Sequence, residues 1–136
     1  MRILCLGAGA VGGYFAGRLV EGGADVTFLV RDARKKNLAE HGLRIESQFG
    51  NFAAPVKAIT AAELSGAFDV ILLTCKAYDL PTAIEDIEGA VGDHSAVLPL
   101  LNGVAHIDIL WPRQSAWRCC QDRVHSGAGR HDQAPQ

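Results

Sequence analysis

The sequence has no long apolar run and no strong excess of positive or negative charge. Its 136 residues carry a formal net charge of −2, so electrostatics gives no argument for binding to nucleic acid or to an anionic membrane. No apolar stretch approaches the roughly 20 residues that span a bilayer. The first apolar segment is too short for a signal peptide and lacks a small-residue cleavage site. We therefore expect a cytoplasmic protein that binds neither nucleic acid nor membranes, with a length of about one domain.

Cysteine is scarce and poorly placed for a disulfide framework. Of the four cysteines, Cys5 and Cys75 lie in apolar, strand-like runs, where a reduced cysteine behaves as a small hydrophobic residue. Cys119 and Cys120 are adjacent, and neighbouring cysteines form a disulfide only under strain. A zinc site could combine this pair with two histidines of the same segment, but the spacing does not match structural zinc ligands. We expect no metal site.

Apolar and amphipathic segments alternate along the first 110 residues. Short apolar runs predict strands at residues 2–6, 25–30, 70–75 and 96–101, with further extended pieces at 43–46 and 52–60. Helical spacing and helix-end signals predict helices at residues 10–21, 31–41 and 81–90, with a helical turn at 61–64. In the first helix the spacing is carried by Val11, Phe15, Leu19 and Val20. Buried strands that alternate with helices indicate a doubly wound, mainly parallel α/β sheet.

Residues 111–136 differ in composition from the rest of the chain. They hold both tryptophans and two of the four cysteines, together with many Arg, His, Gln and Ser residues. They show no sustained period of 2 or 3.6 residues, so the sequence does not place a helix or strand there. We therefore divide the chain into an α/β domain at residues 1–110 and an atypical tail at 111–136. Disorder is one interpretation of the tail, although Trp and Cys are unusual in disordered segments.

A Gly-x-Gly-x-x-Gly pattern formed by Gly7, Gly9 and Gly12 joins the first strand to the first helix. In a strand–turn–helix context this pattern is typical of Rossmann-type dinucleotide-binding domains. Gly7 permits a tight turn, Gly9 lets the pyrophosphate approach the backbone, and Gly12 allows close packing of helix and strand. The N–H groups at the helix N-terminus suit the anionic pyrophosphate. The predicted cofactor-binding residues of this turn are Gly7, Ala8, Gly9, Ala10, Val11 and Gly12.

Arg31 lies at the end of the second strand, where such domains distinguish the two nicotinamide cofactors. An acidic residue at this point holds the ribose 2′-OH of NAD, whereas an arginine accommodates the 2′-phosphate of NADP. Arg31 is followed by Asp32 and then by a basic cluster of Arg34, Lys35 and Lys36. A dianionic phosphate suits this cluster, so we favour NADP as the cofactor. The alternatives are a solvated basic helix face with Asp32 as its N-cap, or NAD with Asp32 as the ribose partner.

Three features narrow this domain to one family. They are GAGAVGGYFAGRL at residues 7–19, VTFLVR at residues 26–31, and the strand-end pair LLTCKAY at residues 72–78 and LLNGV at residues 100–104. Together these features resemble the N-terminal NADP-binding domain of the ketopantoate reductase (2-dehydropantoate 2-reductase) family. The resemblance covers residues 1 to about 110, in the family's order and at its spacing.

The resemblance implies an NADPH-dependent oxidoreductase that reduces 2-dehydropantoate, a small 2-keto acid, to pantoate in pantothenate biosynthesis. Arg31 matches the residue at the 2′-phosphate. Lys76 and Asn102 match polar residues that line the cleft near the nicotinamide and the substrate. Both follow predicted parallel strands, whose carboxyl ends are where open α/β sheets bind ligands. Taken singly, Lys76 could be a surface lysine and Asn102 part of an Asn-Gly turn.

The chain also departs from the family pattern. Family members continue into a mostly helical second domain, whose lysine acts as the general acid and whose acidic residue helps to bind substrate. No lysine follows Lys76 in this sequence, so we assign no catalytic residue and expect an incomplete sheet without the second domain. Loss of a general acid typically costs about 10²- to 10⁴-fold in rate. We expect a truncated, inactive or impaired fragment, and a reading-frame shift near codons 109 to 111 is our hypothesis for the tail.

Two other functions remain open. One is a catalytically silent NADP-binding module, and the other is a different Rossmann oxidoreductase that acts on another 2-keto acid. An incomplete doubly wound sheet also leaves a strand edge and apolar faces uncovered. We therefore expect marginal solubility, with homo-oligomerisation or aggregation through the uncovered edge.

Overall fold

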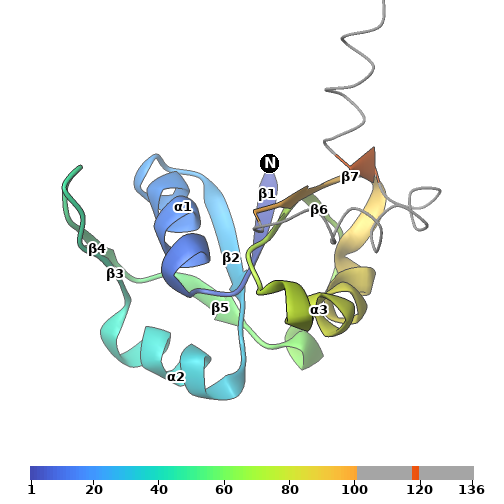
Figure 1. Ribbon diagram of the computed structural model, residues 1–136, viewed down its shortest axis with the longest axis horizontal. Helices are drawn as coiled ribbons and strands as arrows, with labels where there is room; N and C mark the ends of the chain where they lie inside the picture. The colour runs from blue at the N-terminus through green and yellow to red at the C-terminus, as the bar shows by residue number, and fades with distance from the viewer. Residues whose placement is uncertain (101–117, 120–136) are drawn as a thin grey trace, which may run out of the picture.

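The first strand of the chain lies inside the main sheet, between the second and the sixth. The computed structural model describes residues 1–100 and 118–119 (Figure 1). Its main sheet has six strands in the order β5-β2-β1-β6-β7-β8, and every neighbouring pair is parallel. The strands are β1 (Arg2–Leu6), β2 (Asp25–Leu29), β5 (Lys57–Ile59), β6 (Phe68–Leu73), β7 (Val91–Pro99) and β8 (Arg118–Cys119). The predicted Rossmann-type, doubly wound α/β fold is confirmed.

Helices connect the strands on both faces of this sheet. They are α1 (Ala10–Glu21), α2 (Asp32–His41) and α3 (Leu80–Ile87), with short 3₁₀ turns at η1 (Ala61–Glu63), η2 (Ala77–Asp79) and η3 (Glu88–Ala90). A separate antiparallel hairpin of β3 (Leu43–Ile45) and β4 (Phe52–Ala54) lies beside α1 (Figure 1). The second extended piece predicted at residues 52–60 therefore divides between this hairpin and β5 of the main sheet. Within the described residues, no helix is long and apolar enough to span a membrane.

The alternation of side chains along β1 separates two apolar cores. Leu4 and Leu6 pack with α3, and the core on that face also contains Ile71, Leu73, Ile84 and Ile87. Ile3 and Cys5 point to the opposite face, where the core contains Ala16 of α1, Phe28, Leu38 and Leu72. Because successive strand residues face opposite sides of a sheet, the two clusters place α1 and α3 on opposite faces (Figure 1).

The buried face of α1 is not the one that its large apolar residues indicate. The spacing of Val11, Phe15 and Leu19 correctly predicted a helix, but these side chains are 42%, 51% and 38% exposed. The buried residues of this helix are instead Gly12, Gly13, Ala16 and Gly17. An added Cβ at Gly17 would lie 2.4 Å from Ile45 Cδ1 of the hairpin. Small residues therefore let α1 approach the sheet and the hairpin closely, and its bulkier side chains lie outside that contact.

The strands of the second half differ from their predicted bounds. β6 begins at Phe68 and ends at Leu73, so Cys75 lies beyond it and is only half-buried. β7 begins at Val91, five residues before the prediction, through a polar stretch that gives no apolar signal. The buried Ser95 explains this extension, because its hydroxyl donates to the Phe68 carbonyl at 2.5 Å and accepts from the Gly92 amide at 2.8 Å. The side chain thus satisfies backbone groups where the β6–β7 register is irregular.

The tail also contains a strand that the sequence did not predict. β8 pairs in parallel with β7, with Ala96 opposite Arg118 and Val97 opposite Cys119. A strand of two residues has no detectable period, so periodicity could not have found it. The strand extends the main sheet beyond β7.

Candidate functional site

The glycine turn after β1 has the backbone geometry of a tight strand-to-helix connection. Gly7 has a φ of +96°, which side chains disfavour, and its amide donates to the Leu29 carbonyl of β2 at 2.9 Å. Gly9 is the N-cap of α1, and its carbonyl accepts the first helical hydrogen bond from Gly13 at 2.8 Å. The turn is therefore tied to the end of β2 while it opens directly into α1.

Gly12 is required because Thr74 fills the space beside it. An added Cβ at Gly12 would lie 2.3 Å from Thr74 Oγ1 and 2.7 Å from the Gly7 carbonyl oxygen. The Thr74 hydroxyl is fixed there, since it donates to the Leu6 carbonyl at 2.6 Å. Thr74 thus joins the carboxyl end of β6 to the end of β1 directly under the glycine turn. The close helix–strand packing expected of Gly12 is present.

Cys5 supports the turn from below and has no nucleophilic character. Its side chain is fully buried, with Sγ 3.4 Å from the Gly7 carbonyl oxygen and 3.8 Å from that of Gly12. Burial raises the pKa of this thiol to about 12, although a hydrogen bond with Thr74 acts in the opposite direction. A thiol that stays protonated near neutral pH is a packing group here.

The outer side of the turn is open. An added Cβ at Gly9 would meet nothing within 4 Å, and Ala10 is exposed, whereas Ala8 is only 5% exposed. The first amides of α1 have no earlier carbonyl within the helix to bind, and a helix N-terminus attracts anions. A filled inner side and an open outer side are what a nucleotide pyrophosphate requires, so the residues present fit a dinucleotide.

Arg31 lies at the start of α2, where it is the N-cap of that helix. Its side chain is exposed, and none of the hydrogen bonds or ion pairs between described residues involves its guanidinium. Asp32 is the first helical residue, so the alternative with Asp32 as the N-cap is wrong. The helix begins one residue earlier than that alternative required. Arg31 thus offers an available cation at the carboxyl edge of the sheet.

Lys76 lies at the same edge, three residues beyond the end of β6. It is exposed, and its Nζ is 6.0 Å from the centre of the Tyr78 ring. Thr74, two residues earlier, contacts the glycine turn, so this loop starts beside the predicted pyrophosphate site. Asn102, the other predicted cleft residue, lies outside the described residues.

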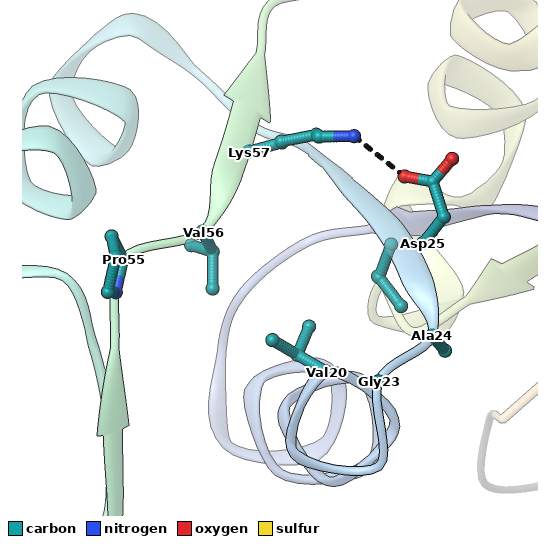
Figure 2. Close-up of a pocket in the computed structure, with 8 residues that line it drawn as sticks. Val20, Gly23, Ala24, Asp25, Pro55, Val56 and Lys57 are labelled. Carbon is teal, nitrogen blue, oxygen red and sulfur yellow. Dashed lines mark hydrogen bonds and ion pairs between the residues drawn. The ribbon is translucent and has the colours of Figure 1, made fainter.

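A cavity of about 330 Å³ lies at the other edge of the sheet and is not part of this site (Figure 2). It is lined by Val20, Gly23, Ala24, Asp25, Val26, Pro55, Val56 and Lys57. Asp25 and Lys57 are the first residues of β2 and β5, so the cavity opens at the amino ends of the strands. Their side chains pair at 2.8 Å, and this hydrogen bond from Lys57 lowers the pKa of Asp25. The two charged side chains that line this cavity are thus paired with each other.

No metal-binding cluster is found in the part of the chain that the structure describes. There, no three side chains of His, Cys, Asp or Glu gather within reach of one ion. Among the residues of the weak zinc alternative, only Cys119 belongs to a described element, and its side chain is not among those described.

The sequence did not identify two side chains that organise this site. Thr74 was visible only as a polar residue within a strand-end motif, and its contact with Gly12 depends on the pairing of β1 with β6. Arg34 was one member of a basic cluster, but its Nη2 donates to the Ala8 carbonyl at 2.8 Å. Both residues reach the turn from other elements, so local spacing carries no signal for either contact.

The chain matches a family of oxidoreductases along nearly its whole length. The family model described as "Ketopantoate reductase PanE/ApbA" matches residues 3–134. The "Uncharacterized oxidoreductase YkpB" of Bacillus subtilis is 45% identical over 111 residues, which are 82% of this chain and 36% of that protein. The 2-dehydropantoate 2-reductase of Mesorhizobium japonicum is 38% identical over 105 residues, which are 76% of this chain and 32% of that protein.

Solved structures of longer proteins share the fold. A 2-dehydropantoate 2-reductase from Geobacter metallireducens has a TM-score of 0.77 at 33% identity, over 83% of this chain and 38% of that one. A D-mandelate dehydrogenase solved with NADH and anilino(oxo)acetate has a TM-score of 0.75 at 30% identity, over 82% of this chain and 37% of that one. This chain spans about a third of the length of the curated relatives that it matches. It belongs to the ketopantoate reductase family.

Proposed function

We propose that residues 1–110 form the NADP(H)-binding half of an enzyme that reduces 2-dehydropantoate to pantoate. The glycine turn carries this proposal, because Thr74 fills its inner side while its outer side stays open for a pyrophosphate. Arg31 stands at the end of the neighbouring strand, where the 2′-phosphate of NADP is bound in such domains. When bound, the nicotinamide supplies the hydride for the reduction.

The residues of this chain have separate tasks in the proposed reaction. The turn from Gly7 to Gly12 binds the pyrophosphate, and Arg31 binds the 2′-phosphate. Lys76 lies at the carboxyl end of β6, where its ammonium suits the carboxylate of a 2-keto acid. Asn102 completes the polar lining near the nicotinamide in this proposal. A group that protonates the developing alkoxide is not assigned, since no lysine follows Lys76 in the sequence.

This assignment predicts a difference between the two cofactors that binding alone can measure. NADPH and NADH are titrated into the full chain, with the fluorescence of the reduced nicotinamide as the readout. Arg31→Ala should lower the affinity for NADPH about tenfold or more, as expected for loss of hydrogen bonds between charged groups. It should change the affinity for NADH little. Arg44→Ala, which removes an exposed arginine from β3, is the matched control. Equal weakening of both cofactors by Arg31→Ala contradicts the assignment to the 2′-phosphate.

Another 2-keto acid is the second candidate substrate. This candidate is supported by the D-mandelate dehydrogenase of similar fold, whose structure was solved with NADH and anilino(oxo)acetate, an aromatic 2-oxo acid. A comparison of 2-dehydropantoate with aromatic 2-keto acids tests this alternative, and turnover of an aromatic acid alone supports it. Binding of NADPH without turnover of any such acid supports the catalytically silent module instead.

The division into residues 1–110 and a tail at 111–136 belongs to the same proposal. The match to the family model extends through residue 134, whereas the relatives described above match 105 to 111 residues. The frame-shift hypothesis stays a prediction, and translation of the gene in all frames through the codons of the tail tests it. A family-like continuation with a lysine in another frame supports the hypothesis, and its absence refutes it.

A further inference from the structure

The basic cluster at the start of α2 divides into residues with different surroundings. Lys35 Nζ lies 2.5 Å from Glu63 Oε1 of η1, and this hydrogen bond lowers the pKa of Glu63 to about 2. Lys35 is thus already paired with an anion. Arg34 instead reaches the glycine turn, where its Nη2 donates to the Ala8 carbonyl at 2.8 Å. Of these two neighbours, only Arg34 brings its positive charge to the cofactor side.

The Arg34 guanidinium is held in place but keeps hydrogen-bonding capacity. Besides the bond to Ala8, its Nη1 donates to Asn37 Oδ1 at 3.0 Å. A guanidinium has five N–H donors in a planar fork, so two bonds leave donors that can engage a phosphate. A side chain that is already ordered loses less conformational entropy when it binds a ligand. Arg34 is therefore preorganised beside the turn.

The direction from which Arg34 approaches the turn indicates what it can bind. It extends from α2, whose N-cap is Arg31, and residues three apart at a helix start lie on neighbouring positions of one face. The Ala8 carbonyl that Arg34 contacts directly precedes the N-cap of α1, and the pyrophosphate lies at this helix N-terminus in such domains. Arg31 and Arg34 thus both belong to the start of α2, directly after β2, and the guanidinium of Arg34 reaches the turn. The end of this strand is where the adenosine ribose lies in such domains.

We propose that Arg34 is a second specificity-determining residue, which binds the 2′-phosphate of NADP(H) together with Arg31 and fixes the glycine turn through Ala8. The inference rests on the proposed function, because it assumes that this turn binds a nicotinamide dinucleotide. Substitution of Arg34 should therefore lower the affinity for NADP(H), which carries the 2′-phosphate, more than the affinity for NAD(H).

The test uses four probes on the full chain: NADPH, NADH, 2′,5′-ADP and 5′-ADP. Arg34→Gln should lower the affinity for NADPH and 2′,5′-ADP about tenfold or more, as expected for loss of charge-assisted hydrogen bonds. The same substitution should lower the affinity for NADH and 5′-ADP less than about threefold. Arg34→Lys keeps the charge but loses the planar fork. It should therefore restore part of the preference for the probes that carry the 2′-phosphate. Arg44→Gln is the matched control, and thermal melting of each variant checks that the fold is retained.

Each other outcome overturns the inference in a distinct way. Equal weakening of all four probes by Arg34→Gln means that Arg34 only positions the turn, and the proposed function then stands. Unchanged affinity for all four means that Arg34 does not contact the cofactor. If the wild-type chain melts cooperatively yet binds none of the probes, the proposed function fails together with the inference.

Discussion

Helices α1 and α3 lie on opposite faces of one sheet and bury opposite kinds of residues. α3 buries its large side chains in the core, together with one alanine: Leu80, Ala83, Ile84 and Ile87. α1 buries only small residues, Gly12, Gly13, Ala16 and Gly17, and leaves three large apolar ones partly exposed, Val11, Phe15 and Leu19. Both helices connect neighbouring parallel strands, so the difference does not come from topology.

The difference reflects what each helix positions. α3 contributes apolar area, which is the main favourable term in folding. α1 gives up much of that area in order to bring its backbone against the sheet, so that the glycine turn and Thr74 fit together. Of the two helices, α3 therefore contributes more apolar burial, whereas the candidate cofactor site lies at the start of α1. Substitutions on the two helices should separate these properties.

Truncation of a core residue in α3 should have the largest effect on stability. Ile84 is 1% exposed, and Ile84→Ala should lower the free energy of unfolding by about 2–5 kcal/mol, because it removes apolar contacts and leaves a cavity. Chemical denaturation measures the change. Glu85→Ala, at the exposed neighbouring position, is the control and should stay within about 0.5 kcal/mol. Similar losses for both variants would contradict the role assigned to α3.

Addition of a single methyl group to the glycine turn should have an intermediate effect on stability. Gly12→Ala places a Cβ against Thr74 Oγ1 and the Gly7 carbonyl, and should cost about 1–3 kcal/mol through overpacking. Gly9→Ala is the matched control, because its added Cβ meets nothing within 4 Å. Both substitutions should lower the affinity for NADPH, but only Gly12→Ala should lower the denaturation midpoint. A stable Gly12→Ala protein with unchanged cofactor affinity would refute the proposed fit of the turn.

Replacement of an exposed apolar residue of α1 should have the smallest effect. Phe15 is 51% exposed and packs edge-on against Tyr14, with ring centres 5.4 Å apart. Phe15→Gln should therefore change the free energy of unfolding by less than about 1 kcal/mol. Its clearer consequence should be less self-association at high protein concentration, measured by light scattering. A loss as large as that of Ile84→Ala would mean that this face of α1 belongs to the core after all.

The sequence predicted the fold best where local signals and burial agree. β1 and α1 have the predicted bounds, because an apolar run, a glycine turn and a glycine pair mark both ends of the helix. For α1, however, the sequence predicted only part of the structure. The spacing of apolar residues predicted the helix, but it did not predict which face of the helix is buried. Close packing on glycines depends on what approaches from other strands. The start of β7 was missed for a similar reason, because Ser95 completes the pairing with β6 in a stretch that is polar in sequence.

The sequence likewise predicted one part of the candidate site and missed another. The glycine pattern and Arg31 are read from their positions after β1 and β2, so sequence alone located them. Thr74 and Arg34 act through contacts with residues 68 and 26 positions away, at Leu6 and Ala8. No pattern of local spacing encodes such contacts. They follow from the parallel pairing that brings the ends of β1 and β6 together and places the start of α2 beside the turn.

The central position of β1 has a consequence for how the chain is made. Ile3 pairs with Val26 on one side and with Val70 on the other, so the second partner of β1 is synthesised 67 residues after it. At about 5–20 residues per second, this interval lasts roughly 3 to 13 seconds. During that time the β6 side of an apolar strand offers unpaired backbone groups to other nascent chains. The yield of folded protein should therefore depend on how quickly β6 is synthesised as well as on the stability of the finished sheet.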